Sequence, residues 1–199
     1  MDVFFGGGTS FFKGLALERI VCGIDVNKKM VGVVEKEIKR LFYGKNLNYF
    51  IFKGDAVEKE SYIRVGEYLR KIGKEKVDFV FLHPPYFRAI SYSDDERDLS
   101  NCETVDEFYE RMEKVIDNVG RVLKKGGYCV MVIGDVFIKR EVELLGFKIS
   151  EMLRDGGFKI RSVVVKNVRE RKNGLWEARA LRSDYYNFNH EYVFVYRNG

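Results

Sequence analysis

The stretch VDFVFLHPPYF at residues 77–87 fixes the centre of the predicted fold. Its first six residues are typical of a buried strand, and they run directly into Pro84 and Pro85, the only two prolines of the 199-residue sequence. Proline cannot donate to a sheet ladder, so the pair ends the strand and stiffens the backbone. The carbonyls of residues 83 and 84 are then held without helical partners, and the flat ring of Tyr86 follows. We expect a ligand site at this rigid strand end.

On both sides of this stretch the sequence alternates between strand and helix patterns. Strands are predicted at 19–26, 48–56, 77–82, 128–135, 158–168 and 190–197, and helices at 28–42, 61–72, from the Thr104 capping box to the KKGG at 124–127, and at about 141–155. Strands joined by such helices pair in parallel, whereas the last two lack a helix between them and predict an antiparallel edge. The expected fold is α/β, an open, doubly wound and mostly parallel Rossmann-like sheet.

Length and composition indicate one domain, residues 1–199, with an ordinary core, since 46% of the residues are apolar. No apolar run approaches the roughly 20 residues that span a bilayer, and no leader pattern opens the chain, so a cytoplasmic protein is expected. Two histidines that lie 107 positions apart argue against a His-rich metal site. Glutamine is absent while Lys and Glu are abundant, a bias that resembles hyperthermophile proteins.

The basic residues are unevenly distributed along the chain. The net charge is +5, and residues 166–182 hold six basic and two acidic side chains. A solvated loop and a polyanion contact both explain such a segment. For the second interpretation, the candidate nucleic-acid-binding residues are Arg169, Arg171, Lys172, Trp176, Arg179 and Arg182. The acidic run 94–96 near the prolines does not fit a DNA-binding surface.

Ligands of open α/β sheets bind beyond the carboxyl ends of the strands, and four such ends carry suggestive residues. Glycines 6–8 let the backbone approach a ligand closely, and Asp25, seventeen positions beyond Gly8, is placed as an acid that binds ribose hydroxyls. Asp55 and the segment 83–86 mark the other two ends. Each signal is weak alone. Together they predict a nucleotide-like ligand.

The combined motifs resemble the amino-methyltransferases that use S-adenosylmethionine to methylate exocyclic amines of adenine or cytosine in DNA. The family's [Asp/Asn/Ser]-Pro-Pro-[Tyr/Phe/Trp] motif is matched by His83-Pro84-Pro85-Tyr86, and its Asp-Pro-Phe-x-Gly-x-Gly-Thr motif by residues 2–9. The segments YSDDERDLSN, VLKKGGYCVMVIGDV and HEYVFVYR are further likenesses. The resemblance covers essentially the whole chain.

This resemblance implies a role for each matched residue. The glycine loop would wrap the methionine part of S-adenosylmethionine, Asp25 would bind its ribose, and Asp55 with its neighbours would hold the adenine. The implied cofactor-binding residues are Asp2, Phe4, Gly6, Gly8, Thr9, Asp25, Val26, Asp55 and Ala56. The implied catalytic residues are His83, Pro84, Pro85 and Tyr86. Tyr86 would stack on the target base, flipped out of a duplex or taken from a single strand, while residues 83 and 84 accept hydrogen bonds from its amine. No metal is implied.

The sequence departs from the family pattern at two places. His83 stands where the family has Asp, Asn or Ser; a neutral imidazole can still accept one hydrogen bond, and an imidazolium cannot. Capping of the strand end is the alternative role for His83. The chain also begins inside the glycine motif, so the first strand is expected to be truncated. A misassigned start, a fragment, or a dimer or partner chain that supplies the segment would each explain this.

Other functions stay open at this point. An RNA methyltransferase acting on guanine of tRNA, a protein glutamine methyltransferase and a degenerate, non-catalytic nucleic-acid-binding module share parts of the pattern. A nicotinamide dehydrogenase leaves the paired prolines unexplained. We expect no separate target-recognition domain, so DNA recognition would fall to loops. His190 and Glu191 begin the last strand, and a structural role is expected for both.

Overall fold

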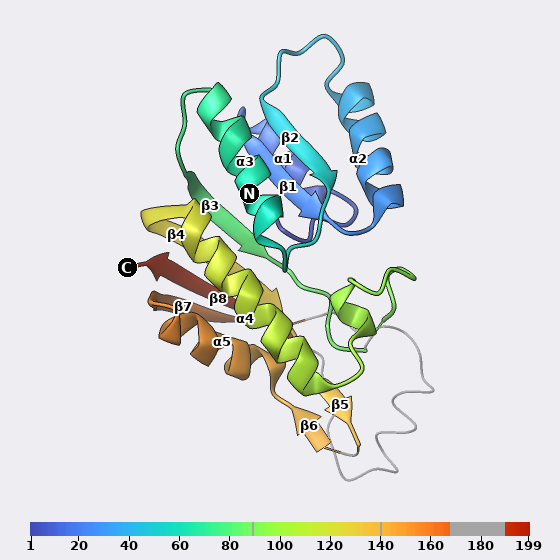
Figure 1. Ribbon diagram of the computed structural model, residues 1–199, viewed down its shortest axis with the longest axis vertical. Helices are drawn as coiled ribbons and strands as arrows, with labels where there is room; N and C mark the ends of the chain where they lie inside the picture. The colour runs from blue at the N-terminus through green and yellow to red at the C-terminus, as the bar shows by residue number, and fades with distance from the viewer. Residues whose placement is uncertain (89, 140, 168–189) are drawn as a thin grey trace.

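The computed structural model describes residues 1–88, 90–139, 141–167 and 190–199 (Figure 1). The helices are α1 (Thr9–Ala16), α2 (Lys28–Leu41), α3 (Lys59–Lys71), α4 (Val105–Val122) and α5 (Leu145–Asp155), with the 3-10 helix η1 (Leu99–Asn101). The strands are β1 (Val21–Asp25), β2 (Tyr49–Lys53), β3 (Val77–Leu82), β4 (Leu123–Ile133), β5 (Val136–Ile138), β6 (Glu141–Glu143), β7 (Phe158–Asn167) and β8 (His190–Asn198). All six predicted nucleic-acid-binding residues, from Arg169 to Arg182, lie outside the described residues.

The first residues of the chain lie at the centre of the main sheet. Asp2 bridges in parallel to Gly23 of β1 on one side and to Phe81 of β3 on the other, so the order is β2, β1, residues 1–3, β3, β4, β8, β7. β1 pairs with β2, and β3 with β4, in parallel, whereas β8 is antiparallel to both β4 and β7. The predicted α/β sheet with an antiparallel edge and a short first strand is confirmed.

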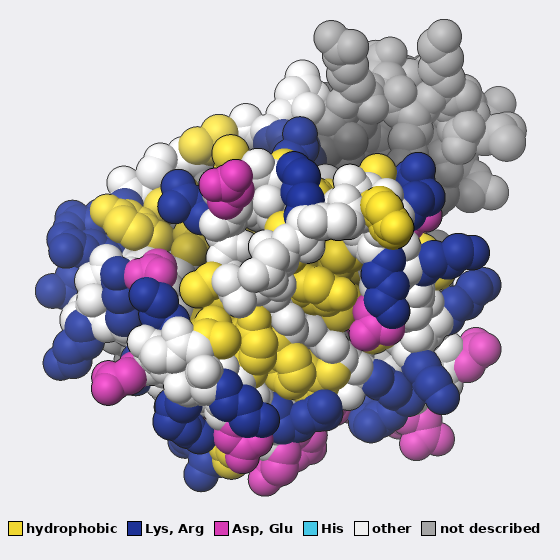
Figure 2. Space-filling view, turned by 90° about the horizontal axis from the view of Figure 1, so that it is seen from above, with side chains coloured by type: hydrophobic (Ala, Val, Ile, Leu, Met, Phe, Trp, Pro, Cys, Tyr) yellow, Lys and Arg dark blue, Asp and Glu magenta, His cyan; other side chains and the backbone are white. Residues whose placement is uncertain are grey.

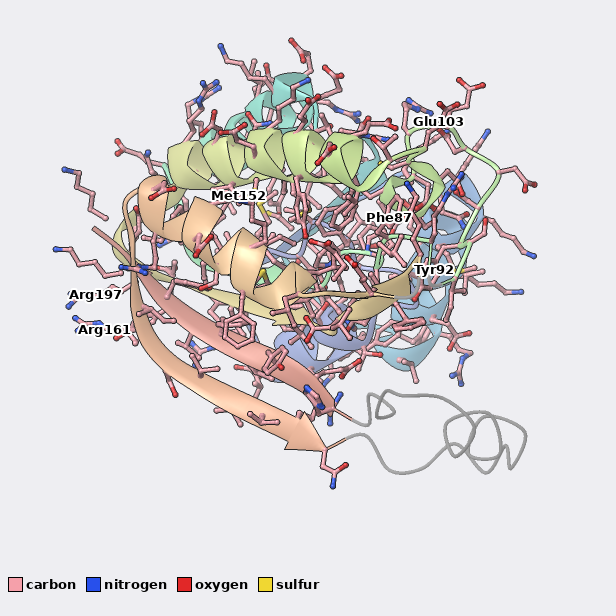
Figure 3. The ribbon with its side chains drawn as sticks, turned by 90° about the horizontal axis from the view of Figure 1, so that it is seen from below. Phe87, Tyr92, Glu103, Met152, Arg161 and Arg197 are labelled. Atoms are coloured by element: carbon pink, nitrogen blue, oxygen red, sulfur yellow. The ribbon has the colours of Figure 1, made fainter. Side chains whose placement is uncertain are left out.

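Helices cover the sheet in two groups, each over its own cluster of buried side chains. α3, α4 and α5 lie in front of the sheet in Figure 1, and Figure 3 shows α4 and α5 on one side of β4, β8 and β7. Their cluster includes Val65, Met112 and Ile149. A smaller cluster, with Phe11 of α1 and Val34 of α2, packs against β1 and β2. Burying these apolar faces holds the helices on the sheet, and the parallel pairing of β1–β4 places the carboxyl ends of these strands at the same edge.

The helix α4 begins where its capping signal predicts. The Thr104 side chain accepts a hydrogen bond from the amide of Glu107 at 3.1 Å, while the Glu107 carboxylate accepts one from the amide of Glu103 at 2.8 Å. The predicted end is wrong, however. α4 stops at Val122, and the KKGG segment belongs to β4. There Gly126, at φ 75°, lies where the ladder between β3 and β4 shifts register.

Two further elements differ from the prediction. α1 directly follows the glycines, and no helix was predicted there. β5 and β6 form a small antiparallel hairpin, so the helix predicted from about residue 141 begins at Leu145. Both elements are short, and short elements give little periodicity.

The end of the molecule at which β1–β3 begin carries a group of exposed hydrophobic side chains. Seen from that side, hydrophobic side chains gather in the middle and Lys and Arg lie around them, with acidic residues interspersed (Figure 2). Ile20 and Phe79, near the starts of β1 and β3, are among the exposed large hydrophobic residues. Within the described part of the chain, no helix is both long and apolar enough to cross a membrane.

Candidate active site

A cavity of about 410 Å³ opens at the carboxyl ends of the parallel strands. This volume lies within the range of ordinary small-molecule sites. The cavity joins the glycine segment to the first three residues of the proline motif, which are 75 or more positions apart in the sequence. Its lining residues are Asp2, Val3, Phe4, Phe5, Gly6, Gly7, Thr9, Ser10, Asp25, Val26, Asn27, Met30, Asp55, Ala56, Phe81, His83, Pro84, Pro85, Tyr92, Arg97, Asp98 and Leu99.

Asp2 shapes the glycine segment. Its backbone is fixed in the sheet by hydrogen bonds to Cys22 and Ile24, and its side chain is 4% exposed. One carboxylate oxygen accepts from the amide of Phe4 at 3.0 Å, and the other accepts from the hydroxyl of Ser10. Burial raises the pKa of Asp2, although both hydrogen bonds oppose that shift. Asp2 therefore ties the start of the glycine turn to the start of α1.

Gly8 is the one predicted cofactor-binding residue that does not line the cavity. It precedes α1 in the left-handed conformation, at φ 80°. A Cβ atom at this position would lie 2.7 Å from a methyl carbon of Val34, so α2 occupies the space where a side chain would be. Gly8 lets α1 and α2 approach each other, whereas Gly6 and Gly7 face the cavity.

Asp25 connects the end of β1 to the glycine turn. Its two carboxylate oxygens accept hydrogen bonds from the amides of Gly6 at 2.7 Å and Asn27 at 2.8 Å. Burial raises the pKa of Asp25 against these two bonds. A carboxylate has about four lone-pair positions, so two remain for donors of a ligand.

Asp55 and Ala56 form the wall of the cavity beyond β2. Asp55 is 8% exposed, and its carboxylate accepts from the amide of Val57 at 2.8 Å. The carbonyl of Ala56 accepts from the buried hydroxyl of Tyr62 at 3.0 Å. Val26 lines the cavity at the end of β1. The structure thus brings together Asp2, Phe4, Gly6, Thr9, Asp25, Val26, Asp55 and Ala56, eight of the nine predicted cofactor-binding residues.

The acidic run 94–96 belongs to a loop that closes one side of the cavity. Asp95 is bound by Arg97 at 2.7 Å and by Lys53 of β2 at 3.3 Å, and the hydrogen bonds from Arg97 lower its pKa. Asp98, which is 3% exposed, accepts from Ser93 and Ser100. Asp95 and Asp98 are therefore bound within the protein, whereas Asp94 and Glu96 are exposed. Tyr92, Arg97 and Asp98 line the cavity and were not predicted to do so.

The proline motif supplies the opposite wall. His83, Pro84 and Pro85 line the cavity, whereas Tyr86 does not. The Tyr86 hydroxyl donates to the Glu191 carboxylate at 2.9 Å and lies 3.4 Å from Nε2 of His83. A Cβ atom on Gly134 would lie 3.1 Å from the Tyr86 ring. The half-buried tyrosine therefore packs against the end of β4 and the start of β8.

The titratable groups of this corner have shifted pKa values. Neighbouring residues shield His83 from water, which lowers the pKa of its imidazole. The negative charge of Glu191 raises this pKa, but by less. Burial, followed by the nearby Glu191 carboxylate, raises the pKa of Tyr86. Burial would raise the pKa of Glu191, but hydrogen bonds from Lys166 and Tyr86 bring it below its ordinary value. At neutral pH these groups are a neutral imidazole, a phenol and a carboxylate.

The charge of the cavity favours a cationic ligand. Its lining includes four carboxylates, Asp2, Asp25, Asp55 and Asp98, and one guanidinium, Arg97. No group of three or more His, Cys, Asp or Glu side chains suited to a metal ion occurs among the described residues. The site can therefore hold a positively charged organic molecule whose hydroxyl and amine donors meet Asp25 and its neighbours.

Comparison with solved structures shows a methyltransferase fold. An S-adenosylmethionine-dependent methyltransferase from Methanosarcina mazei is similar with a TM-score of 0.60 at 14% identity, over 99% of this chain and 90% of that chain. Magnesium protoporphyrin IX methyltransferase from Synechocystis, with bound SAH, is similar with a TM-score of 0.60 at 12% identity, over 100% of this chain and 72% of that chain. At such low identities the likeness concerns the fold alone.

Sequence comparison is more specific. The type II methyltransferase M.SfiI of Streptomyces fimbriatus is 29% identical over an alignment of 154 residues, with a coverage of 64% of this chain and 36% of that protein. The chain thus spans little more than a third of the length of this curated relative. Residues 77–199 match the N6/N4 methyltransferase family model, described as DNA methylase. Since this match covers more than half of the sequence, the chain belongs to the DNA methylase family.

Proposed function

We propose that this chain is the catalytic domain of an S-adenosylmethionine-dependent methyltransferase that modifies the exocyclic amine of adenine or cytosine in DNA. The observation that carries the proposal is the single cavity that joins the glycine segment and Asp25 to His83, Pro84 and Pro85. Membership of the DNA methylase family supports DNA as the substrate. The fold and the family both support the cofactor.

The cavity residues fit S-adenosylmethionine. The cofactor carries a sulfonium and an ammonium group, and four carboxylates against one guanidinium suit such a charge. Asp25 would hold the ribose hydroxyls with its two remaining lone pairs, Asp55 and Ala56 would hold the adenine, and the glycine segment would hold the methionine part. When bound, the cofactor supplies an electrophilic methyl group.

The proline motif would orient the amine that receives the methyl group. The Pro84 carbonyl and the neutral His83 accept hydrogen bonds from the amine, which turns its lone pair away from them and toward the cavity. Tyr86 follows the lining prolines and stacks on the base after it has left the duplex. Holding both reactants in one geometry supplies much of the rate.

Methyl transfer with nucleoside analysis tests the proposal. The chain is incubated with tritiated S-adenosylmethionine and either DNA or RNA, and the labelled nucleosides are identified. Label in N6-methyladenine or N4-methylcytosine of DNA supports it. Label in methylguanine of tRNA would replace it with the RNA alternative. Cofactor binding by calorimetry without any transfer would favour a non-catalytic module, and no binding at millimolar cofactor would overturn the cofactor assignment.

Several expectations stay predictions. These are a dimer or partner chain, the absence of a separate target-recognition domain, a cytoplasmic location and a thermophilic source. DNA contact by residues 169–182 also stays a prediction.

A further inference from the structure

The hydroxyl of Tyr86 lies where three distant segments of the chain meet. It donates to Oε1 of Glu191 at 2.9 Å and lies 3.4 Å from Nε2 of His83, while the ring edge faces Gly134. Glu191 is 105 positions away in the sequence. The tyrosine is therefore held by β8 rather than by its own loop.

The Glu191 carboxylate is itself fixed in place. Lys166 of β7 is its cross-strand neighbour, and its ammonium group lies 2.7 Å from Oε2. The Glu191 side chain is only 19% exposed. Since Lys166 takes Oε2, Oε1 is turned toward Tyr86. Both hydrogen bonds are charge-assisted, and such bonds are roughly twice as strong as neutral ones.

This arrangement determines where the protons lie. A phenol has one proton, and a carboxylate can only accept, so Tyr86 donates to Glu191. Toward His83 the phenol oxygen can then only accept. The neutral imidazole that satisfies this contact carries its proton on Nε2, which leaves Nδ1 as its hydrogen-bond acceptor. The lowered pKa of His83 and the raised pKa of Tyr86 keep both groups in these forms at neutral pH.

We propose that Glu191 is a positioning residue that orients the Tyr86 hydroxyl and thereby selects the His83 tautomer whose Nδ1 accepts a hydrogen bond from the substrate amine. His83 lines the cavity, so the residue that carries this acceptor belongs to the site described above. The donor and acceptor roles of Tyr86, Glu191 and His83 follow from the structure and do not depend on the proposed function. Only the role in amine recognition rests on the proposed methyl transfer.

Imidazole nitrogen NMR tests the tautomer directly, because the chain contains two histidines. At about pH 8, above the ordinary histidine pKa, we expect His83 to be protonated on Nε2. In Glu191→Ala the Tyr86 hydroxyl is free to donate to Nε2, so the population should shift toward the Nδ1-protonated form. A wild-type His83 protonated on Nδ1, or equal populations in both proteins, would overturn the inference. A His190→Asn variant assigns the signals.

Two further variants separate tautomer selection from loss of folding. Glu191→Gln keeps a carbonyl oxygen that accepts from Tyr86, so the wild-type tautomer should persist. Tyr86→Phe removes the acceptor that holds the proton on Nε2, so the Nδ1-protonated fraction should rise, but by less than in Glu191→Ala, where the hydroxyl itself donates to Nε2. If Glu191→Ala does not fold, the Tyr86→Phe spectrum decides alone, and an unshifted spectrum contradicts the proposal.

Kinetics then test the link to catalysis. Glu191→Ala should lower kcat about tenfold or more, as expected for the loss of a charge-assisted hydrogen bond, while the Kd of S-adenosylmethionine stays within about twofold. The double variant with Tyr86→Phe should be no slower than Tyr86→Phe alone, because Glu191 acts through that hydroxyl. Additive losses would overturn the coupling. Absence of methyl transfer by the wild type would count against the proposed function, and the NMR result would still decide the tautomer.

Discussion

The two walls of the cavity are held by different kinds of contact. On the cofactor side, three strand ends repeat one local device: Asp2, Asp25 and Asp55 each accept a hydrogen bond from the amide two residues further on. Such Asx turns are encoded within three residues. On the proline side, Tyr86 is held by Glu191, 105 positions away, and Glu191 by Lys166. The Asx turns of the cofactor wall are thus encoded locally, whereas the contact that holds Tyr86 forms only once β7 and β8 have paired.

This difference teaches that variants on the two walls should fail in different ways. Changes on the cofactor side should alter folding or cofactor affinity. Changes on the proline side should alter the rate of transfer while the cofactor still binds. Four measurements test this contrast, and they are given in order of decreasing expected effect.

Gly8→Ala should have the largest effect, on stability. A left-handed non-glycine residue costs about 1–2 kcal/mol, and overpacking against Val34, at 2.7 Å, adds about 1–3 kcal/mol. Gly6→Ala is the matched control, since Gly6 is also at positive φ but has open space at its Cβ position. Denaturant unfolding should show a clearly larger loss for Gly8→Ala. Equal losses would mean that the contact with α2 does not matter.

Asp25→Ala should weaken cofactor binding, whereas the loss of an exposed carboxylate elsewhere should not. It removes the acceptor of two backbone amides and of the proposed ribose contact, so we expect about 2 kcal/mol, or roughly thirtyfold in Kd. Asp78→Ala removes an exposed carboxylate that pairs with Lys124 outside the cavity. Calorimetry should find its Kd within about twofold of the wild type. Similar effects of both variants would contradict the assignment of Asp25.

Gly134→Ala should slow methyl transfer while leaving the cofactor bound. The added methyl group would lie 3.1 Å from the Tyr86 ring and displace it. We expect about a tenfold loss in kcat, equivalent to about 1.4 kcal/mol, with unchanged Kd for S-adenosylmethionine. Gly120→Ala is the control, because its Cβ would meet Phe158 at an ordinary 3.8 Å. A wild-type rate for Gly134→Ala would show that the Tyr86 position does not matter.

The smallest effect should be the change in the rate of methyl transfer with pH. Because packing lowers the pKa of His83, its imidazole stays neutral at pH 7 and is protonated only below the ordinary value of about 6.5. The rate of methyl transfer should be flat from about pH 8.5 to 7 and should fall only when the pH drops below the ordinary histidine pKa. His83→Asn should abolish this fall. A wild-type rate that stays constant down to about pH 5.5 would remove His83 from the acceptor role.

The sequence predicts the sheet well because its signals are local. Apolar runs such as VDFVFL end at residues that cannot continue a strand, and their alternation with helices implies parallel pairing. The helix end predicted at the KKGG segment was wrong because pairing with β3 draws that segment into β4, and the helix start predicted near residue 141 was wrong because the short β5–β6 hairpin shows little periodicity. A glycine pair after a helix is typical of a cap, yet Gly126 serves a shift of register in β4.

In the candidate site, the residues with local signals were predicted, and the residues that reach the site only through tertiary folding were missed. Glycines and aspartates at strand ends mark the cofactor wall, although no local signal shows that Gly8 faces α2 rather than a ligand. Arg97 and Asp98 were missed because they reach the cavity through the folding of their loop. Glu191 was assigned a structural role, since nothing near HEY indicates a partner 105 residues away.

The most direct test is a crystal structure of the chain with S-adenosylhomocysteine. We expect the ribose at Asp25, the adenine beside Asp55 and Ala56, and the thioether between the glycine segment and Pro84. A ligand bound elsewhere, or bound here with its sulfur turned away from the prolines, would contradict this expectation.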